Sequence, residues 1–97
     1  MIEHVVLFKL KADVTAEAKT AAVAALKGLK DQIEGIVDLT CGLNFSERSQ
    51  GHEIGLVVRF RDRVALEVYI PHPAHRGVVD RYLQPIRESV IVVDFEI

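Results

Sequence analysis

The stretch Ile2-Glu3-His4-Val5-Val6-Leu7-Phe8-Lys9-Leu10-Lys11, residues 2–11, decides the fold. It is rich in β-branched and aromatic residues, which favours a β-strand. Side chains of a strand alternate between two faces, so one face carries Ile2, His4, Val6, Phe8 and Leu10, and the other carries Glu3, Val5, Leu7, Lys9 and Lys11. Both faces are apolar in the middle. The sequence therefore predicts a strand that is covered on both sides.

Helices and further strands are predicted on the C-terminal side of this strand. Thr15 and Asp62 are predicted helix N-caps, and Gly35 is a predicted left-handed C-cap. Pro71 and Pro73 interrupt the later helical region, because proline cannot donate the helical hydrogen bond. The predicted elements are a helix from residue 15, strands at 36–45 and 54–60, helices at 63–69 and 74–86, and a strand at 90–97. This βαββαβ order predicts one α+β domain over residues 1–97, with a ferredoxin-like antiparallel sheet.

The sheet has more apolar surface than its own helices can cover. The two helical regions of this fold pack on one face of the sheet, yet residues 2–11 and 54–60 are apolar on both faces. The chain has no further segment for the second face, so a partner chain is expected to cover it. A two-fold homodimer is the default for such a chain. We therefore expect a homodimer through the sheet face, which gives a dimeric α+β barrel.

The composition argues against several classes of function. The chain has 97 residues, a formal net charge of −2 and no Trp, which disfavours nucleic-acid binding. No apolar run is long enough to span a membrane. Cys41 is the only cysteine, so an intrachain disulfide is ruled out and a reducing cytoplasm is expected. A glycine-rich phosphate loop, a Gly-x-Ser-x-Gly elbow and a dinucleotide fingerprint are all missing, and no cofactor is expected.

Several short motifs resemble the stress-responsive A/B barrel family. They are His4-Val5-Val6-Leu7-Phe8-Lys9, Asn44-Phe45-Ser46, Phe60-Arg61-Asp62, Tyr69 to His75, and Val92-Val93-Asp94-Phe95. The likeness covers nearly the whole chain, and the Tyr69 to His75 segment is its most specific part. The resemblance implies a dimeric ferredoxin-like barrel. It implies no single activity, because most proteins of this kind have no assigned reaction and some plant members are stress proteins.

One branch of the family, olivetolic acid cyclase, closes polyketide chains by aldol condensation. Its histidine base, its tyrosine and its first-strand histidine correspond to His75, Tyr69 and His4 of this sequence. The surroundings depart from that branch: residues 21–26, Ala-Ala-Val-Ala-Ala-Leu, replace bulky aromatics, and Pro71 replaces an aliphatic residue. These differences argue against a pocket shaped for an aromatic polyketide.

The resemblance makes His75, Tyr69 and His4 the candidate catalytic residues. His75 would take a proton from a carbon next to a carbonyl, Tyr69 would donate to the oxyanion, and His4 would orient the substrate. The expected substrate-binding residues are Val6, Phe8, Val23, Leu26 and His72. In the alternative interpretation His75 caps a helix, His4 is a buried histidine satisfied by one hydrogen bond, and Tyr69 is a core aromatic. His72, His75 and Asp80 are too sparse a ligand set for zinc, and no metal is expected.

Two functional hypotheses remain open. The first is a small-molecule-binding protein or a cofactor-free enzyme, such as a cyclase or isomerase, with its pocket between sheet and helices. The second is a non-catalytic structural or stress-associated dimer, in which the alanine-rich helix closes the pocket. Haem-degrading or quinol monooxygenases share this type of barrel, but the sequence has no matching motif.

Overall fold

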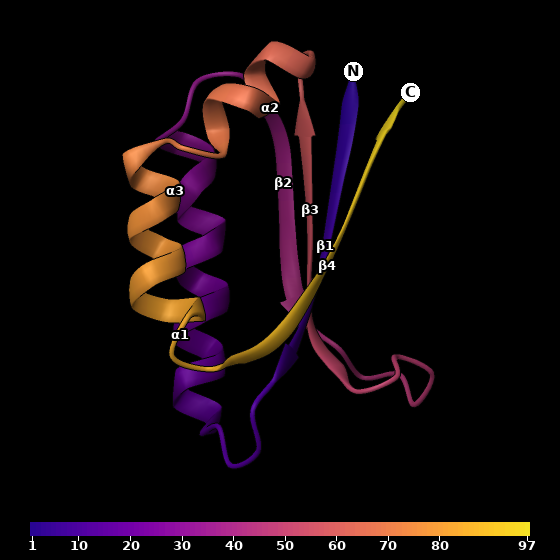
Figure 1. The fold of residues 1–97 in the computed structure, drawn as a ribbon, viewed down its shortest axis with the longest axis vertical. Helices are drawn as coiled ribbons and strands as arrows, with labels where there is room; N and C mark the ends of the chain where they lie inside the picture. Colours follow the sequence, from indigo (N-terminus) through magenta and orange to yellow (C-terminus); the bar gives the residue numbers. More distant parts are fainter.

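The four strands form one antiparallel sheet, and the three α-helices lie on one side of it (Figure 1). The computed structural model describes residues 1–97. The strands are β1 (Ile2–Leu10), β2 (Ile36–Leu43), β3 (His52–Phe60) and β4 (Arg87–Glu96), and the α-helices are α1 (Ala16–Lys27), α2 (Arg63–Tyr69) and α3 (Pro73–Val78). The strand order across the sheet is β2-β3-β1-β4. The predicted α+β class and βαββαβ order are confirmed.

β1 lies inside the sheet and buries alternate side chains, as its sequence predicts. All five residues predicted for one face are buried, at 3–7% exposure: Ile2, His4, Val6, Phe8 and Leu10. Val58 and Leu56 of β3 stand opposite His4 and Val6, so the buried faces of the two strands coincide. The core therefore lies between β1, β3 and the helices.

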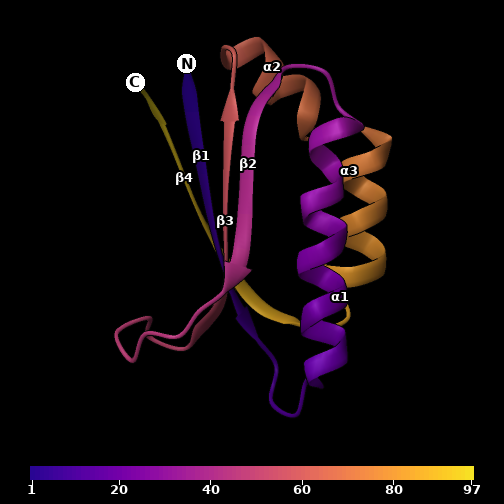
Figure 2. The ribbon, with the colours of Figure 1, turned by 180° about the vertical axis from the view of Figure 1, so that it is seen from behind.

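The other side of the sheet has no helix over it (Figure 2). Register places Val57 and Val93 beside Val5, Ile91 beside Leu7, and Phe95 beside Glu3. We call this surface, formed by Val5, Leu7, Val57, Ile91, Val93 and Phe95, the open face. Leu7, Ile91, Val93 and Phe95 are 38–52% exposed. The predicted apolar second face of the sheet is therefore present and uncovered in the single chain.

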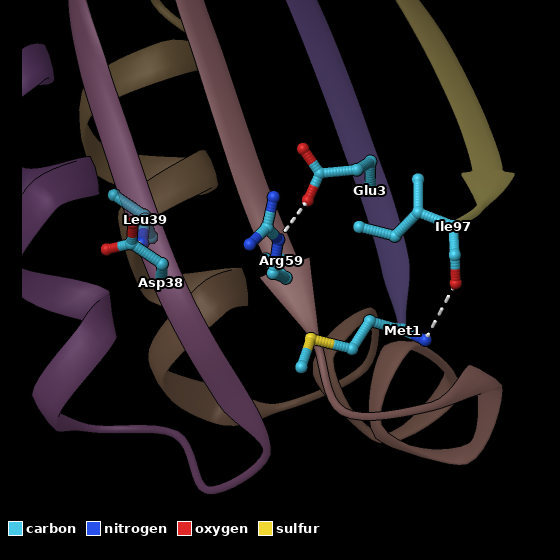
Figure 3. Close-up of polar contacts among 6 residues, drawn as sticks. All are labelled: Met1, Glu3, Asp38, Leu39, Arg59 and Ile97. Carbon is cyan, nitrogen blue, oxygen red and sulfur yellow. Dashed lines mark hydrogen bonds and ion pairs between the residues drawn. The ribbon is translucent and has the colours of Figure 1, made fainter.

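A charged pair borders the open face near the chain termini. Nε of Arg59 donates to Oε1 of Glu3 at 2.7 Å, across neighbouring strands (Figure 3). The amino group of Met1 donates to the carbonyl oxygen of Ile97 at 3.4 Å, which ties β1 to β4 at the same end. The apolar surface therefore ends in a polar edge.

None of the helices has the length and apolar character that crossing a membrane requires.

The first helix ends earlier than its pattern predicts. Thr15 caps α1 by accepting from the amide of Ala18 at 3.1 Å, as expected. However, α1 ends at Lys27, and a 3₁₀ turn, η1 (Gly28–Asp31), follows it. The prediction of Gly35 as helix C-cap is wrong, because Gly28 occupies that position. Gly35 does have the left-handed conformation, with φ +96°, in the turn before β2.

The second helical region is divided more than its pattern predicts. Asp62 caps α2, accepting from the amide of Ala65 at 2.9 Å, and the chain breaks at Pro71 and Pro73 as expected. α3 is short and continues as a π-helical segment, η2 (Val79–Leu83). β4 begins at Arg87, earlier than the predicted Val90, because Arg87 pairs with Leu10 of β1. Because Arg87-Glu88-Ser89 is polar, the sequence pattern does not indicate that the strand begins there.

Candidate functional site

A cavity of about 320 Å³ lies between the helices and the β1–β4 part of the sheet. β1 and β4 form one wall, and the other wall comes from α1, the end of α2, α3 and η2. The lining residues are His4, Val6, Phe8, Leu26, Leu56, Tyr69, Ile70, His75, Arg76, Val79, Arg87, Val90, Val92 and Asp94. The three candidate catalytic residues therefore share one largely apolar cavity.

His75 is held in the first turn of α3 by the proline segment before it. Pro73 begins the helix, and Nδ1 of His72 caps it by accepting from the amide of Ala74 at 3.0 Å. Nδ1 of His75 lies 2.9 Å from the carbonyl oxygen of Ile70. A carbonyl oxygen only accepts, so Nδ1 carries the proton and Nε2 keeps a free lone pair.

His75 is neutral at physiological pH. Burial is the largest influence on the pKa of its imidazole and lowers it. The hydrogen bond to the carbonyl oxygen of Ile70 acts in the opposite direction and raises the pKa. The nearby positive charge of Arg76 lowers the pKa further. A neutral imidazole with one free nitrogen can accept a proton from a bound molecule.

Tyr69 has a buried hydroxyl without a hydrogen-bond partner. Its side chain is fully buried, and its ring centroid lies 4.2 Å from that of His75. The hydroxyl oxygen is the one buried side-chain polar atom of the chain that lacks a partner. Burial raises the pKa of Tyr69 strongly, so the hydroxyl stays protonated. A protonated hydroxyl without a protein partner is the kind of donor that an oxyanion site requires.

His4 is held by an acid on the neighbouring strand. Asp94 stands opposite His4 in the β1–β4 register, and its Oδ1 lies 2.5 Å from Nδ1 of His4. An ionised carboxylate only accepts, so Nδ1 of His4 is protonated. The His4 ring lies 5.8 Å from the Tyr69 ring in an edge-on arrangement. His4 is therefore fixed in orientation on the wall next to Tyr69.

The structure separates the predicted binding residues into two groups. Val6, Phe8 and Leu26 line the cavity with His4, Tyr69 and His75. Val23 packs against the core instead, and His72 serves as the cap of α3; neither lines the cavity. Sequence reasoning missed Arg76, Val79 and the β4 residues Arg87, Val90, Val92 and Asp94. Alternation along β4, set in register with His4, could have found Val90, Val92 and Asp94.

A second hollow, of about 430 Å³, lies at the β2–β3 hairpin and includes Leu7 of the open face. Cys41 and His52 line it. Burial raises the pKa of the Cys41 thiol to about 11, so Cys41 is a thiol at neutral pH.

No group of three or more His, Cys, Asp or Glu side chains in the chain is placed to hold a metal ion.

Two kinds of sequence comparison identify the same family. The family model "Stress responsive A/B Barrel Domain" matches residues 2–97. A stress-response A/B barrel domain-containing protein of Arabidopsis thaliana is 34% identical over 98 residues, covering 97% of this chain and 36% of its own length. An uncharacterized protein of Streptomyces coelicolor is 36% identical over 81 residues, covering 81% of this chain and 84% of its own length. The chain thus spans about a third of the Arabidopsis relative and most of the bacterial one.

Solved structures agree in fold. A dimeric protein of unknown function with a ferredoxin-like fold from Bacteroides fragilis has TM-score 0.82 and 30% identity, covering 99% of this chain and 95% of its own. A hydroxynitrile lyase from Passiflora edulis has TM-score 0.86 and 14% identity, and the alignment covers 99% of this chain and 92% of the lyase chain. At this low identity the likeness shows the fold alone. The ferredoxin-like fold predicted from sequence is confirmed. On the family-model match over residues 2–97, with which the Arabidopsis relative agrees, this chain belongs to the stress-responsive A/B barrel domain family.

Proposed function

We propose that this protein is a homodimer that binds a small carbonyl compound between sheet and helices and catalyses a cofactor-free proton transfer on it. The reaction class is that of a cyclase or isomerase. One observation carries this proposal: Tyr69, whose buried hydroxyl has no protein partner, lines the same cavity as the neutral imidazole of His75. A buried hydroxyl without a partner lowers stability by about 1–3 kcal/mol. A ligand oxygen that accepts its hydrogen bond would remove that penalty.

The mechanism divides the chemistry between three side chains. Nε2 of His75 takes a proton from the carbon next to the ligand carbonyl, and the electron pair moves onto the carbonyl oxygen. That oxygen becomes an enolate and accepts a hydrogen bond from the Tyr69 hydroxyl. Return of the proton from His75 to another carbon gives isomerisation. In ring closure the enolate carbon attacks a second carbonyl of the same molecule, and the alkoxide that forms takes the proton back from Nε2 of His75. His4, fixed by Asp94, orients the ligand.

The homodimer would form through the open face. Four of its six apolar side chains are exposed in the single chain, and the Bacteroides fragilis neighbour of the same fold is described as dimeric. An interface of ordinary size buries roughly 800 Å² on each partner. In a dimer with a two-fold axis, the same apolar surface of each copy packs against that of the other.

The single free cysteine fits a reducing cytoplasm as the place of action.

The alternative function, a non-catalytic structural or stress-associated dimer, requires the helices to close the space above the sheet. The cavity of about 320 Å³ and the unpartnered Tyr69 hydroxyl favour the ligand-binding proposal over it. The Passiflora edulis hydroxynitrile lyase supports the proposal at the level of fold, since a chain of this shape carries an enzyme activity there.

Deuterium exchange tests the proposal directly. A panel of 1,3-diketones and keto acids is incubated with the protein in D₂O, and loss of the α-proton signal is followed by NMR. We expect the protein to accelerate exchange for compounds that bind, and His75→Gln to lose about 10²–10⁴-fold of that acceleration, the usual contribution of a positioned base. His52→Gln is the matched control, since His52 lies outside the cavity. Equal rates in the wild type and His75→Gln would refute the role of His75 as base.

A further inference from the structure

The cavity between sheet and helices carries more positive than negative charge. Arg76 and Arg87 both line it, and Asp94 is its one carboxylate. Asp94 is already paired with His4. Neither arginine belongs to any of the chain's seven ion pairs. The one hydrogen bond of either guanidinium runs from Nη2 of Arg87 to the amide oxygen of Gln84, at 3.1 Å. Both guanidinium groups are therefore free to pair with an anion in the cavity.

The charges lie at opposite ends of the wall formed by β1 and β4. Register places Arg87 opposite Leu10 at one end and Asp94 opposite His4 at the other. Val90 and Val92 stand between them, opposite Phe8 and Val6. At about 3.3 Å per residue, roughly 23 Å of strand separates the Cα atoms of Arg87 and Asp94. The wall is thus cationic at one end, apolar in the middle, and polar at the end that holds Tyr69 and His75.

We infer that the ligand is an elongated carboxylic acid whose carboxylate pairs with Arg87 and whose carbonyl end lies at Tyr69 and His75. This assignment rests on the proposed function and adds the substrate class to it. The apolar chain of the acid lies over Val90 and Val92. Arg76 supplies a second positive charge from the helix wall. Asp94 repels an acidic group, which fixes the direction of the ligand in the cavity.

Charge and shape favour a carboxylate at the end of an apolar chain. The planar guanidinium of arginine matches a carboxylate with two parallel hydrogen bonds. Octanoate carries the acid and an apolar chain, and it probes the part of the cavity that holds Arg87, Val90 and Val92. 1-Octanol differs from it chiefly by lacking the charge.

The test compares octanoate, 1-octanol and octyl phosphate by NMR titration of the full chain, following the methyl groups of Val79 and Val92 in the cavity and Leu7 on the open face. We expect octanoate to bind at least about tenfold more tightly than 1-octanol, because it gains a charge-assisted contact. Arg87→Gln should bring octanoate to about the affinity of 1-octanol, and Arg76→Gln should reduce its affinity less. Arg81→Gln, on η2 but outside the cavity lining, should leave all affinities unchanged.

Each other outcome overturns a defined part of the inference. Equal affinity of octanoate and 1-octanol at the cavity methyls would reject the acid and leave small-molecule binding intact. Tighter binding of octyl phosphate would reject a carboxylate in favour of a phosphate. A preference for octanoate that survives in Arg87→Gln would reject Arg87 as its partner. Shifts at none of the cavity methyls with any of the three compounds would contradict both the inference and the proposed binding function.

Discussion

At the scale of single residues, the buried hydroxyl of Tyr69 departs from ordinary core packing. A core tyrosine normally hydrogen-bonds its hydroxyl, and this one does not. The ring is held tightly all the same, with Phe60 at 4.9 Å and His75 at 4.2 Å between ring centroids. The hydroxyl is therefore fixed in position and without a protein acceptor.

Replacing Tyr69 with phenylalanine gives opposite expected results for stability and function. Without ligand, Tyr69→Phe should be as stable as the wild type or up to about 1–3 kcal/mol more stable, because an unsatisfied buried polar atom is removed. α-Proton exchange should fall. Urea unfolding and the exchange assay measure the two effects. A clear loss of stability would show that the hydroxyl has a structural partner and contradict the account.

His75 gives a pH dependence with a definite sign. Its pKa in the folded chain lies below the usual value of 6.5, so the unfolded chain binds more protons as the pH falls below about 6.5. The folded state should therefore lose stability as the pH falls through that region and reach a constant loss below the folded pKa. Denaturant unfolding of the wild type and His75→Gln between pH 4 and 8 measures this. The difference in unfolding free energy between the two proteins should vary with pH below about pH 6.5 and stay constant above it. A difference that does not vary with pH would contradict the burial of His75.

The sequence identified His4, Tyr69 and His75 because they belong to motifs that resemble a known family. It did not identify Asp94 or Arg87, since their place in the cavity depends on the β1–β4 register, which no local pattern displays. His72 was placed in the pocket by its proximity to His75 along the chain. Its Nδ1 is instead used to cap α3.

At the scale of elements, the turn after the first helical region depends on Gly35. Its φ of +96° is a conformation that residues with a Cβ rarely adopt. A Cβ built at this position would lie 2.7 Å from the Cβ of Ala65 in α2, so the turn also packs tightly against the helix that ends at Tyr69.

Alanine substitution at two glycines tests this directly. Gly35→Ala should lose at least about 1–3 kcal/mol of unfolding free energy from backbone strain, with a further loss from the contact with Ala65. Gly77→Ala is the matched control: Gly77 lies within α3 with nothing within 4 Å of an added Cβ, and the change should stabilise by up to about 1 kcal/mol. Chemical denaturation measures both variants. Equal stabilities would contradict the close approach of the turn to α2.

Element order was predictable because strong local signals mark it: alternation in β1, a capping threonine, and prolines that break the helical region. Element ends were less predictable. α1 gives way to a 3₁₀ turn at Gly28, and α3 continues as the π-helical segment η2, although the apolar spacing reads as one continuous helix in both places. Sequence periodicity does not distinguish a 3₁₀ or π-helical turn from an α-helical one, so these endings could not be predicted.

At the scale of the whole molecule, the open face is the main unsatisfied feature of the single chain. Val5, Leu7 and Val57 form its centre, with Ile91 and Val93 of the edge strand β4 beside them. The sequence predicted this face from the two-sided apolar pattern of residues 2–11. It could not indicate how two such faces meet, because that depends on the shape of the assembled sheet.

A charge placed on the open face should separate the subunits without unfolding them. Leu7 is 38% exposed in the single chain, so Leu7→Glu introduces little strain there. In a dimer it would bury two carboxylates without partners, which is strongly unfavourable. Val64→Glu is the control, since Val64 is 65% exposed on α2, away from the open face. Circular dichroism should show both variants folded, and sedimentation should show a smaller particle for Leu7→Glu alone.

Light scattering during size-exclusion chromatography at micromolar concentration gives the molar mass of the unmodified protein and so decides whether two chains pair. A homodimer gives a single species of twice the chain mass of 10.8 kDa. A well-behaved species at the mass of one chain would contradict pairing through the open face, because that apolar face would then be stable in water.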